Sequence, residues 1–319
     1  MSELRWNPIT REWVIMATKR QKRPVMPSKG CPFDVGSEET PEEYDLLALP
    51  NRFPSLQLDA PEPKQNEESF YKTAPGKGVC EVILYSSDHE GVLGEYPLDH
   101  LIRLVDLWKE RYEAIGVEEA VDYVFIFENR GEEIGVTLQH PHGQLYGYPF
   151  IPPFIERRLE GAKAYHDEEK QCLFCDTIKH ELLSEDRLVH INDGFITFVP
   201  YWSKWSYEVN ILSRRHIGSL SELRDNEKPL LAEALKTVLQ KYDRLFGFKL
   251  PFIMVLHQNP TDGGEYSFHH FAIEFYPPHR SEDKLKYLAG SETGVRAHIN
   301  VTSPEDAAAE LRGVMVNDV

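Results

Sequence analysis

Hydrophobic side chains recur at helical spacing in two long segments of the chain. In the first, Leu101–Ile115, leucine and tryptophan return every three or four residues. The second, Lys228–Phe246, repeats this spacing with leucine and valine. An apolar stripe of this period is typical of a helix with one buried face, so both segments are predicted to be amphipathic helices.

Shorter apolar runs around these two segments predict strands. Each predicted helix follows one such run and precedes two others. This order predicts an α+β fold in which helices pack on antiparallel sheets. The runs are Val82–Tyr85, Tyr123–Phe127 and Gln139–Tyr146 around the first helix, and Val209–Leu212, Phe252–Leu256 and Phe271–Tyr276 around the second.

The chain contains the same unit twice. The segment at 81–95, EVILYSSDHEGVLGE, aligns without a gap with 208–222, EVNILSRRHIGSLSE, and 7 of 15 positions are identical. Downstream the match resumes at an offset of 130, with His140 over His270. Ordered matches of this kind indicate a duplicated fold rather than chance similarity.

The chain length agrees with a duplication, because 319 residues are about twice those of a typical domain. We predict two tandem repeats of one α+β unit. The first copy spans residues 1–165, and the second, degenerate copy spans 166–319. A polar helix at Glu156–Lys170 is expected to link them.

A metal site is predicted in the second copy. Cys172 and Cys175 have the spacing with which two thiolates reach one tetrahedral ion. The repeat supplies His216 and His270, which would complete a closed set of two cysteines and two histidines, of the structural zinc type. His269 competes with His270 for the fourth position, and the alignment favours His270.

The first copy has an analogous set, Cys31, Asp34, His89 and His140. A carboxylate stands where the second copy has its second thiolate, and zinc accepts oxygen ligands. We therefore expect one or two Zn²⁺ ions per chain. The identity of the metal and the occupancy of this first set stay open.

Chemistry is predicted on the segment His140-Pro141-His142-Gly143-Gln144. In an extended strand the residues at 140, 142 and 144 face the same side. His140 would anchor the strand to the metal while His142 presents an imidazole, which is a competent nucleophile toward phosphorus. In the second copy Ala272 replaces this histidine, so only the first copy keeps both metal and nucleophile.

Composition narrows the choice of partners and compartment. With 35 basic and 52 acidic residues, the net charge of −17 disfavours nucleic acid and anionic membranes. No apolar run reaches the roughly 18 residues of a membrane span, and a charged N-terminus argues against a signal peptide. We expect a cytoplasmic protein. Lys19–Arg23 is a basic run suited to an anionic ligand.

Several motifs resemble the galactose-1-phosphate uridylyltransferase family, a duplicated branch of the histidine-triad superfamily. The resemblance extends from about residue 5 to residue 312. The motifs are HPHGQ at 140–144, NPITREWV at 7–14, KRQKRP at 19–24, PNRF at 50–53, FENRG at 127–131 and FYPP at 275–278.

The resemblance implies a ping-pong exchange of UMP between UDP-glucose and galactose 1-phosphate. His142 matches the nucleophile that forms a covalent uridylyl intermediate, and Gln144 matches the residue that holds the transferred phosphoryl group. A homodimer is implied, because Arg20 and Arg23 match cations that approach the nucleotide from the neighbouring subunit. The remaining matches are Asn51 and Phe53 for the nucleoside, Asn129 and Thr137 for phosphate, and Lys286 and Glu292 for the hexose.

Two departures from the family pattern bear on metal and substrate. A second metal site of a bacterial form, built from one glutamate and three histidines, aligns with Arg158, His257, Ala272 and Glu274, so that site is expected to be absent. The family often has an aromatic residue directly before the hexose-binding glutamate. This chain has Ser291 at that position, which leaves the sugar specificity open.

Two other functions also stay open. An ADP-sugar phosphorylase or adenylyltransferase of the same superfamily would use the same nucleophile with adenine nucleotides and phosphate. A non-catalytic, zinc-stabilised protein would bind nucleotide sugars without turnover. Base preference and acceptor are therefore not settled by the sequence.

Overall fold

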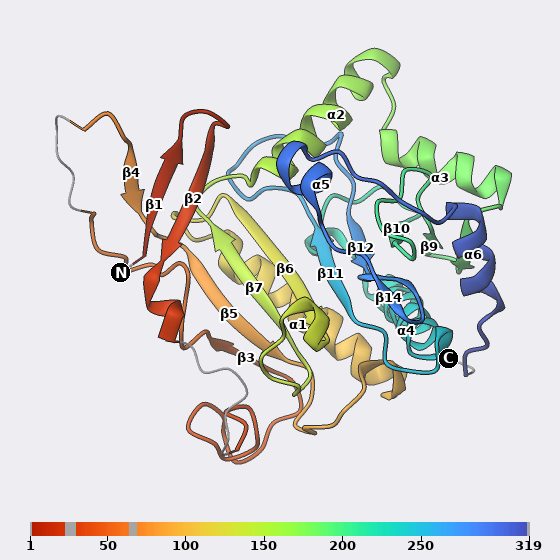
Figure 1. The fold of residues 1–319 in the computed structure, drawn as a ribbon, viewed down its shortest axis with the longest axis horizontal. Coiled ribbons are helices and arrows are strands. Elements are labelled where there is room, and N and C mark those ends of the chain that lie inside the picture. The colour runs from red at the N-terminus through yellow and green to blue at the C-terminus, as the bar shows by residue number, and fades with distance from the viewer. Residues whose placement is uncertain (1, 23–29, 64–68, 318–319) are drawn as a thin grey trace.

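Strands from both copies join in one nine-stranded antiparallel sheet (Figure 1). The computed structural model describes residues 2–22, 30–63 and 69–317. In spatial order the sheet contains β3 (Leu47–Pro50), β5 (Val79–Leu84), β7 (His142–Tyr148), β6 (Tyr123–Arg130), β11 (Phe252–His257), β12 (Ala272–Tyr276), β10 (Val209–Ser213), β9 (Phe195–Phe198) and β8 (Leu188–Ile191).

The two copies meet where β6 pairs with β11. Phe127 of the first copy lies opposite Val255 of the second copy in this antiparallel pair. Beyond this junction, each copy contributes a corresponding hairpin neighbour, β7 on one side and β12 on the other. The predicted duplication and the α+β class are thus both present, with the two repeats sharing one sheet.

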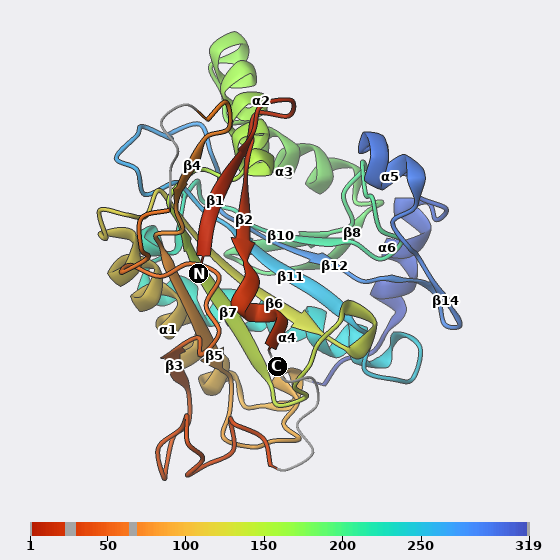
Figure 2. The same cartoon turned by 60° about the vertical axis from the view of Figure 1, so that its left-hand side comes forward.

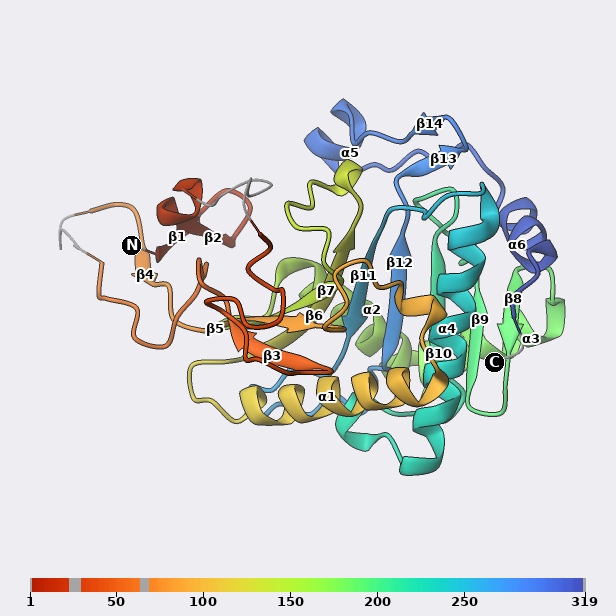
Figure 3. The same ribbon diagram turned by 90° about the horizontal axis from the view of Figure 1, so that it is seen from below.

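Helices α1 (Leu98–Gly116) and α4 (Lys228–Leu245) contact each other on one face of this sheet (Figure 3). Their apolar stripes bury Trp108 and Leu235 completely in the main core. Burial of such side chains contributes about 1.5–3 kcal/mol each. The prediction of both helices is confirmed, although α1 begins three residues earlier than predicted, directly after Pro97.

The opposite face is covered unevenly. Near the junction of the two copies, α2 (Pro153–Glu169) packs Ile155 and Leu159 against Tyr123 of β6, and over the second copy α3 (Leu173–Ser184) packs Ile178 against the sheet. The expected linker helix is therefore also a packed layer. Over β5 and the start of β7 a cavity lies instead, and within the described residues no α-helix contributes a side chain to its lining.

Smaller elements flank the large sheet. Figure 2 shows the hairpin of β1 (Ser2–Asn7) and β2 (Glu12–Ala17) beside the first copy, where β1 also pairs with β4 (Thr73–Pro75). The C-terminal part contains β13 (His279–Ser281), β14 (Lys284–Leu285), α5 (Gly290–Val295) and α6 (Pro304–Gly313). Within the described ranges, no helix combines the length and apolar character that crossing a bilayer requires.

The predicted strand at 139–146 begins later than expected. β7 starts at His142, and His140 belongs to the preceding loop. Pro141 explains the difference, because it has no N–H to donate to a neighbouring strand. Both histidine rings nevertheless face Phe33, at centroid distances of 6.1 Å for His140 and 5.3 Å for His142.

Candidate active site

A cavity of about 500 Å³ lies over the first copy, on the sheet face that α1 and α4 leave free. His142 and Gln144 of β7 form its floor, together with Val82 of β5. Gln144 lies between Val82 and Phe127 in the strand register. The two residues predicted to carry chemistry therefore open into one cavity.

The imidazole of His142 is buried and held in one tautomer. Its Nδ1 lies 2.7 Å from the carbonyl oxygen of His140. A carbonyl only accepts, so Nδ1 carries the proton and donates it, and the lone pair resides on Nε2. This is the protonation state that a histidine nucleophile requires.

The first predicted metal set converges beside this strand. Ligand atoms of Cys31, Asp34, His89 and His140 all lie within 4.8 Å of one another. The Nε2–H of His140 donates to the Ser86 carbonyl at 2.7 Å, which leaves the lone pair on Nδ1. That buried nitrogen has no hydrogen-bond partner among the described residues, and it lies 3.5 Å from Asp34.

The charge state of this set suits a cation. Burial raises the pKa of Asp34, but its 2.8 Å hydrogen bond with His89 and further contacts outweigh that effect and lower it. Asp34 is thus a carboxylate at neutral pH. Burial raises the pKa of the Cys31 thiol, so a bound cation is what would favour its thiolate form.

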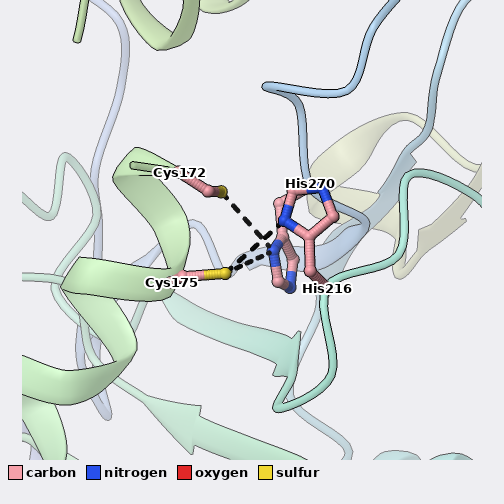
Figure 4. A group of neighbouring side chains, drawn as sticks. All are labelled: Cys172, Cys175, His216 and His270. Atoms are coloured by element: carbon pink, nitrogen blue, oxygen red, sulfur yellow. Dashed lines mark hydrogen bonds between the residues drawn. The ribbon is translucent and has the colours of Figure 1, made fainter. Parts of the chain in front are cut away.

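The second predicted set forms the same arrangement in the second copy (Figure 4). Nδ1 of His270 lies 3.8 Å from the sulfur of Cys172 and 3.7 Å from that of Cys175, and Nδ1 of His216 lies 3.5 Å from Cys175. The neighbouring Cys175 thiol and the two imidazoles lower the pKa of Cys172. Thiolate sulfur with imidazole nitrogen is the donor set that tetrahedral zinc prefers.

The two sets have equivalent supporting hydrogen bonds. As Ser86 does for His140, the Ser213 carbonyl accepts from Nε2 of His270 at 2.8 Å, so Nδ1 faces the sulfurs. His269 lies outside the set, since its Nδ1 is 3.0 Å from Asn259 Oδ1. Hydrogen bonds that orient a ligating imidazole in this way are usual around metal sites.

In the second copy, packed side chains fill the position that corresponds to the strand of His142. Ala272, the counterpart of His142, is fully buried in an apolar cluster that includes Ile178. Glu274, the counterpart of Gln144, pairs with Arg158 at 2.6 Å. Apolar packing and an ion pair therefore occupy the space where the first copy is open.

The same ion pair explains why a metal site of one glutamate and three histidines does not fit here. Arg158 places a guanidinium beside the potential ligands, and His257 is the single histidine within ion-pair distance of Glu274 in the described part of the chain, at 3.4 Å. The positively charged side chain already compensates the buried carboxylate.

Comparison with known proteins decides the family. The family models for galactose-1-phosphate uridyl transferase match residues 1–152 with the N-terminal domain and residues 158–318 with the C-terminal domain. The chain belongs to the galactose-1-phosphate uridyl transferase family. A galactose-1-phosphate uridylyltransferase of Thermotoga maritima is 43% identical over 314 residues, which cover 98% of each chain. The Rattus norvegicus enzyme is 30% identical over 97% of this chain and 86% of its own.

Solved structures agree with this assignment. A structure described as that of uridylyltransferase matches with a TM-score of 0.90 and 36% identity, covering 97% of both chains. An ADP-glucose phosphorylase from Arabidopsis thaliana, solved with bound ADP-glucose, matches with a TM-score of 0.76 and 23% identity over 99% of this chain and 100% of its own. The second similarity concerns the fold alone.

The residues that the transferase resemblance assigns to the nucleoside line the cavity of His142. Asn51 and Phe53 lie in its wall, and Asn51 Oδ1 accepts a 2.9 Å hydrogen bond from the Phe53 backbone. Arg20 donates to the Phe53 carbonyl at 3.0 Å and to the Tyr146 hydroxyl at 3.1 Å within the same chain. Arg23 lies outside the described residues.

The two residues assigned to phosphate lie on the other side of His142. Asn129 lines an adjoining cavity of about 310 Å³, which shares His142 and Leu138 with the first cavity. Thr137 lies next to the first metal set. Its buried hydroxyl has no hydrogen-bond partner within the described part of the chain.

Lys286 and Glu292 are not brought to this cavity. Their side chains form a 3.4 Å ion pair near α5, and neither lines the wall of either cavity at His142. The structure of one chain therefore separates the predicted hexose residues from the predicted nucleophile.

Sequence reasoning missed two residues that support the site. Phe33 packs against both histidines, and the Tyr44 hydroxyl lies 3.1 Å from Nε2 of His140. The repeat contained a signal for the first residue. CPFD aligns with CLFC, and Phe174 likewise lies 5.9 Å from the ring of His270.

Proposed function

We propose that this protein exchanges UMP between UDP-glucose and galactose 1-phosphate through a uridylyl group on His142. One observation carries the proposal: His142 presents a tautomerically fixed imidazole to the cavity that also contains Gln144, Asn51 and Phe53. Membership in the galactose-1-phosphate uridyl transferase family supports this choice of substrates.

In the first half-reaction the Nε2 lone pair of His142 attacks the α-phosphorus of UDP-glucose. A P–N bond forms while the bond to the bridging oxygen breaks, and glucose 1-phosphate leaves with that electron pair. The Nδ1–H keeps its bond to the His140 carbonyl, which supports the developing positive charge on the ring. No proton needs to move in this step.

In the second half-reaction a phosphate oxygen of galactose 1-phosphate attacks the same phosphorus. The P–N bond breaks, and Nε2 regains its lone pair. The amide N–H of Gln144 is placed to hold a phosphoryl oxygen in both steps, and as a neutral group it does not compete for protons. Asn129 and Thr137 are proposed as further phosphate contacts.

Two Zn²⁺ ions are proposed as structural components. The sets Cys31/Asp34/His89/His140 and Cys172/Cys175/His216/His270 have suitable donors and oriented imidazoles. Each set supplies four protein ligands, which leaves no position for a catalytic water. In the first copy a bound ion would fix the loop that carries the His140 carbonyl.

We also propose a homodimer in the cytoplasm. Lys286 and Glu292 do not reach the cavity of their own chain, so a second copy is the proposed recipient of these hexose contacts. Arg20 and Arg23 are proposed to contact the nucleotide phosphates near the subunit boundary. The division at residues 165 and 166 is proposed as the boundary between the nucleotide and hexose parts.

Isotope exchange tests the proposal directly. Labelled glucose 1-phosphate should enter UDP-glucose in the absence of galactose 1-phosphate, since only a covalent intermediate permits this partial reaction. His142→Ala should abolish the exchange. If labelled glucose 1-phosphate instead enters ADP-glucose, and phosphate removes the adenylyl group from the protein, the phosphorylase alternative is supported. A phosphorylase of this kind has the same fold.

A further inference from the structure

Gly143 separates the two reactive side chains, and a hydroxyl fills the space beneath it. A Cβ atom at position 143 would lie 2.1 Å from the Tyr85 hydroxyl oxygen. Such a distance is far below any real contact, so the tyrosine and a side chain at this position exclude each other. The second copy has Ile273 at the corresponding position, on a strand that carries no nucleophile.

The main chain around Tyr85 holds the same segment. Its N–H donates to the Pro141 carbonyl at 3.0 Å, and its own carbonyl accepts from Nε2 of His100 at 2.7 Å. The next carbonyl, that of Ser86, accepts from His140. These bonds join helix α1 to the loop directly before His142.

A small group of buried polar atoms surrounds the Tyr85 ring. The Tyr85 hydroxyl, Trp108 Nε1 and Glu128 Oε2 are all buried, and Glu128 and Trp108 lie close enough to the tyrosine to shift the pKa of its hydroxyl. Burial raises the pKa of Glu128 to about 7 and, with the Glu128 charge, raises that of Tyr85. Tyr85 and Glu128 also line the 310 Å³ cavity that His142 shares.

We propose that Tyr85, supported by Glu128, is a positioning residue for His142. The hydroxyl lies against Gly143 on the helix side and sets how far the imidazole of the preceding residue projects into the substrate cavity. The inference rests on the proposed function, because it concerns the placement of that nucleophile. Neither residue touches the reacting atoms.

The expected effect is on the chemical step. Displacing a nucleophile by about 1 Å can reduce the rate on the order of 100-fold. Removing one oxygen allows a smaller movement. Tyr85→Phe should therefore slow formation of the uridylyl intermediate roughly 10-fold, with KM for UDP-glucose changed less than about twofold.

A matched control removes a buried hydroxyl elsewhere. Tyr242 is equally buried in α4, and its hydroxyl donates to the Tyr207 carbonyl at 2.7 Å. Tyr242→Phe should lower the melting temperature without slowing formation of the uridylyl intermediate. Glu128→Gln should slow it in the same direction as Tyr85→Phe, and this variant keeps the tyrosine in place.

Gly143→Ala provides the test of contact. As a single variant it should form the intermediate more slowly than Tyr85→Phe does, because the new methyl group clashes with the Tyr85 hydroxyl. The double variant should recover part of that loss, since the phenylalanine ring leaves more room. This non-additivity is specific to two groups in contact and is not expected from a general loss of stability.

The measurements are single-turnover intermediate formation and the imidazole NMR signals of His142. Tyr85→Phe should shift those signals, and Tyr242→Phe should not. A Tyr85→Phe protein with the wild-type rate and unshifted signals, or strictly additive effects with Gly143→Ala, would overturn the inference. If the wild type forms no intermediate, the proposed function fails, and the NMR comparison still decides the role of Tyr85.

Discussion

The main-chain carbonyl of His140 accepts a 2.7 Å hydrogen bond from Nδ1 of His142. The side chain of the same residue points toward Asp34 and His89, in the first metal set. One residue thereby connects the proposed structural ion to the tautomer of the proposed nucleophile. A metal ion bound to His140 would therefore help to hold the imidazole of His142 in its tautomer.

Loss of a ligand in the second copy should reduce stability more than chemistry. Cys172→Ala removes one sulfur from the closed set, and zinc binding contributes on the order of 10 kcal/mol in small peptide systems. We expect one metal equivalent less per chain and a clearly lower melting temperature. Intermediate formation per folded molecule should be retained, because no residue of this set lines either cavity at His142.

Cys80→Ala is the matched control for this variant. Cys80 is a buried cysteine in β5 that belongs to neither metal set. It should retain the full metal content measured by elemental analysis. Unchanged metal content and melting temperature in Cys172→Ala would show that the assignment of the second set is wrong.

The ion pair in the second copy should be important for folding. Arg158→Gln leaves Glu274 buried beside Glu208 without its cation, and breaking a buried pair in this way costs about 3–5 kcal/mol. Replacing both partners, as in Arg158→Met with Glu274→Gln, should restore most of that loss. Urea unfolding of the single and double variants measures the difference. Equal stability of Arg158→Gln and wild type would refute the role of the pair.

Glu208 should make stability depend on pH. Burial and the nearby Glu274 charge raise its pKa from 4.5 to about 7. A raised folded pKa favours the neutral form, so its contribution is complete below pH 4.5 and is lost as pH rises to about 7. The shift corresponds to about 3 kcal/mol.

Glu208→Gln should therefore flatten the curve of unfolding free energy between about pH 5 and pH 8. Glu113→Gln, at an exposed position on α1, is the control and should leave the curve unchanged. Chemical denaturation across this pH range provides the measurement. A wild-type curve with the same slope over this interval as the Glu208→Gln curve would be inconsistent with a buried, neutral Glu208.

Restoring the lost histidine should not create a second active site. Ala272→His with Glu274→Gln reproduces the proposed catalytic pair in the second copy, but Ile178 and Arg158 fill the surrounding space. We expect reduced stability from overpacking and still one uridylyl group per chain. Two groups per chain, counted by mass, would show that the second copy retains a usable cavity.

Much of this architecture could be predicted because the sequence is written twice. Hydrophobic spacing alone indicated α1 and α4. The internal alignment of His89 and His140 with His216 and His270 indicated all four histidines as candidate metal ligands. Asp34 was found by its alignment with a cysteine. These signals lie within short segments or depend only on the constant offset between the two copies, so they can be recognised in the sequence.

Other features depend on how the copies pack. Pairing of β6 with β11 is a long-range choice between strand edges, and no pattern within either strand specifies it. The filling of the second copy by α3 and the separation of Glu292 from His142 likewise follow from tertiary packing. The proposed role of Tyr85 rests on its approach to Gly143, a contact between strands that no sequence pattern indicates.

The most direct test of the central claim is intact-protein mass spectrometry after brief incubation with UDP-glucose. The account predicts a mass increase of one UMP per chain, which galactose 1-phosphate removes and which His142→Ala does not acquire. ADP-glucose should give no such adduct. Absence of any adduct on the wild-type protein, or an unchanged adduct on His142→Ala, would contradict the assignment of His142 as the nucleophile.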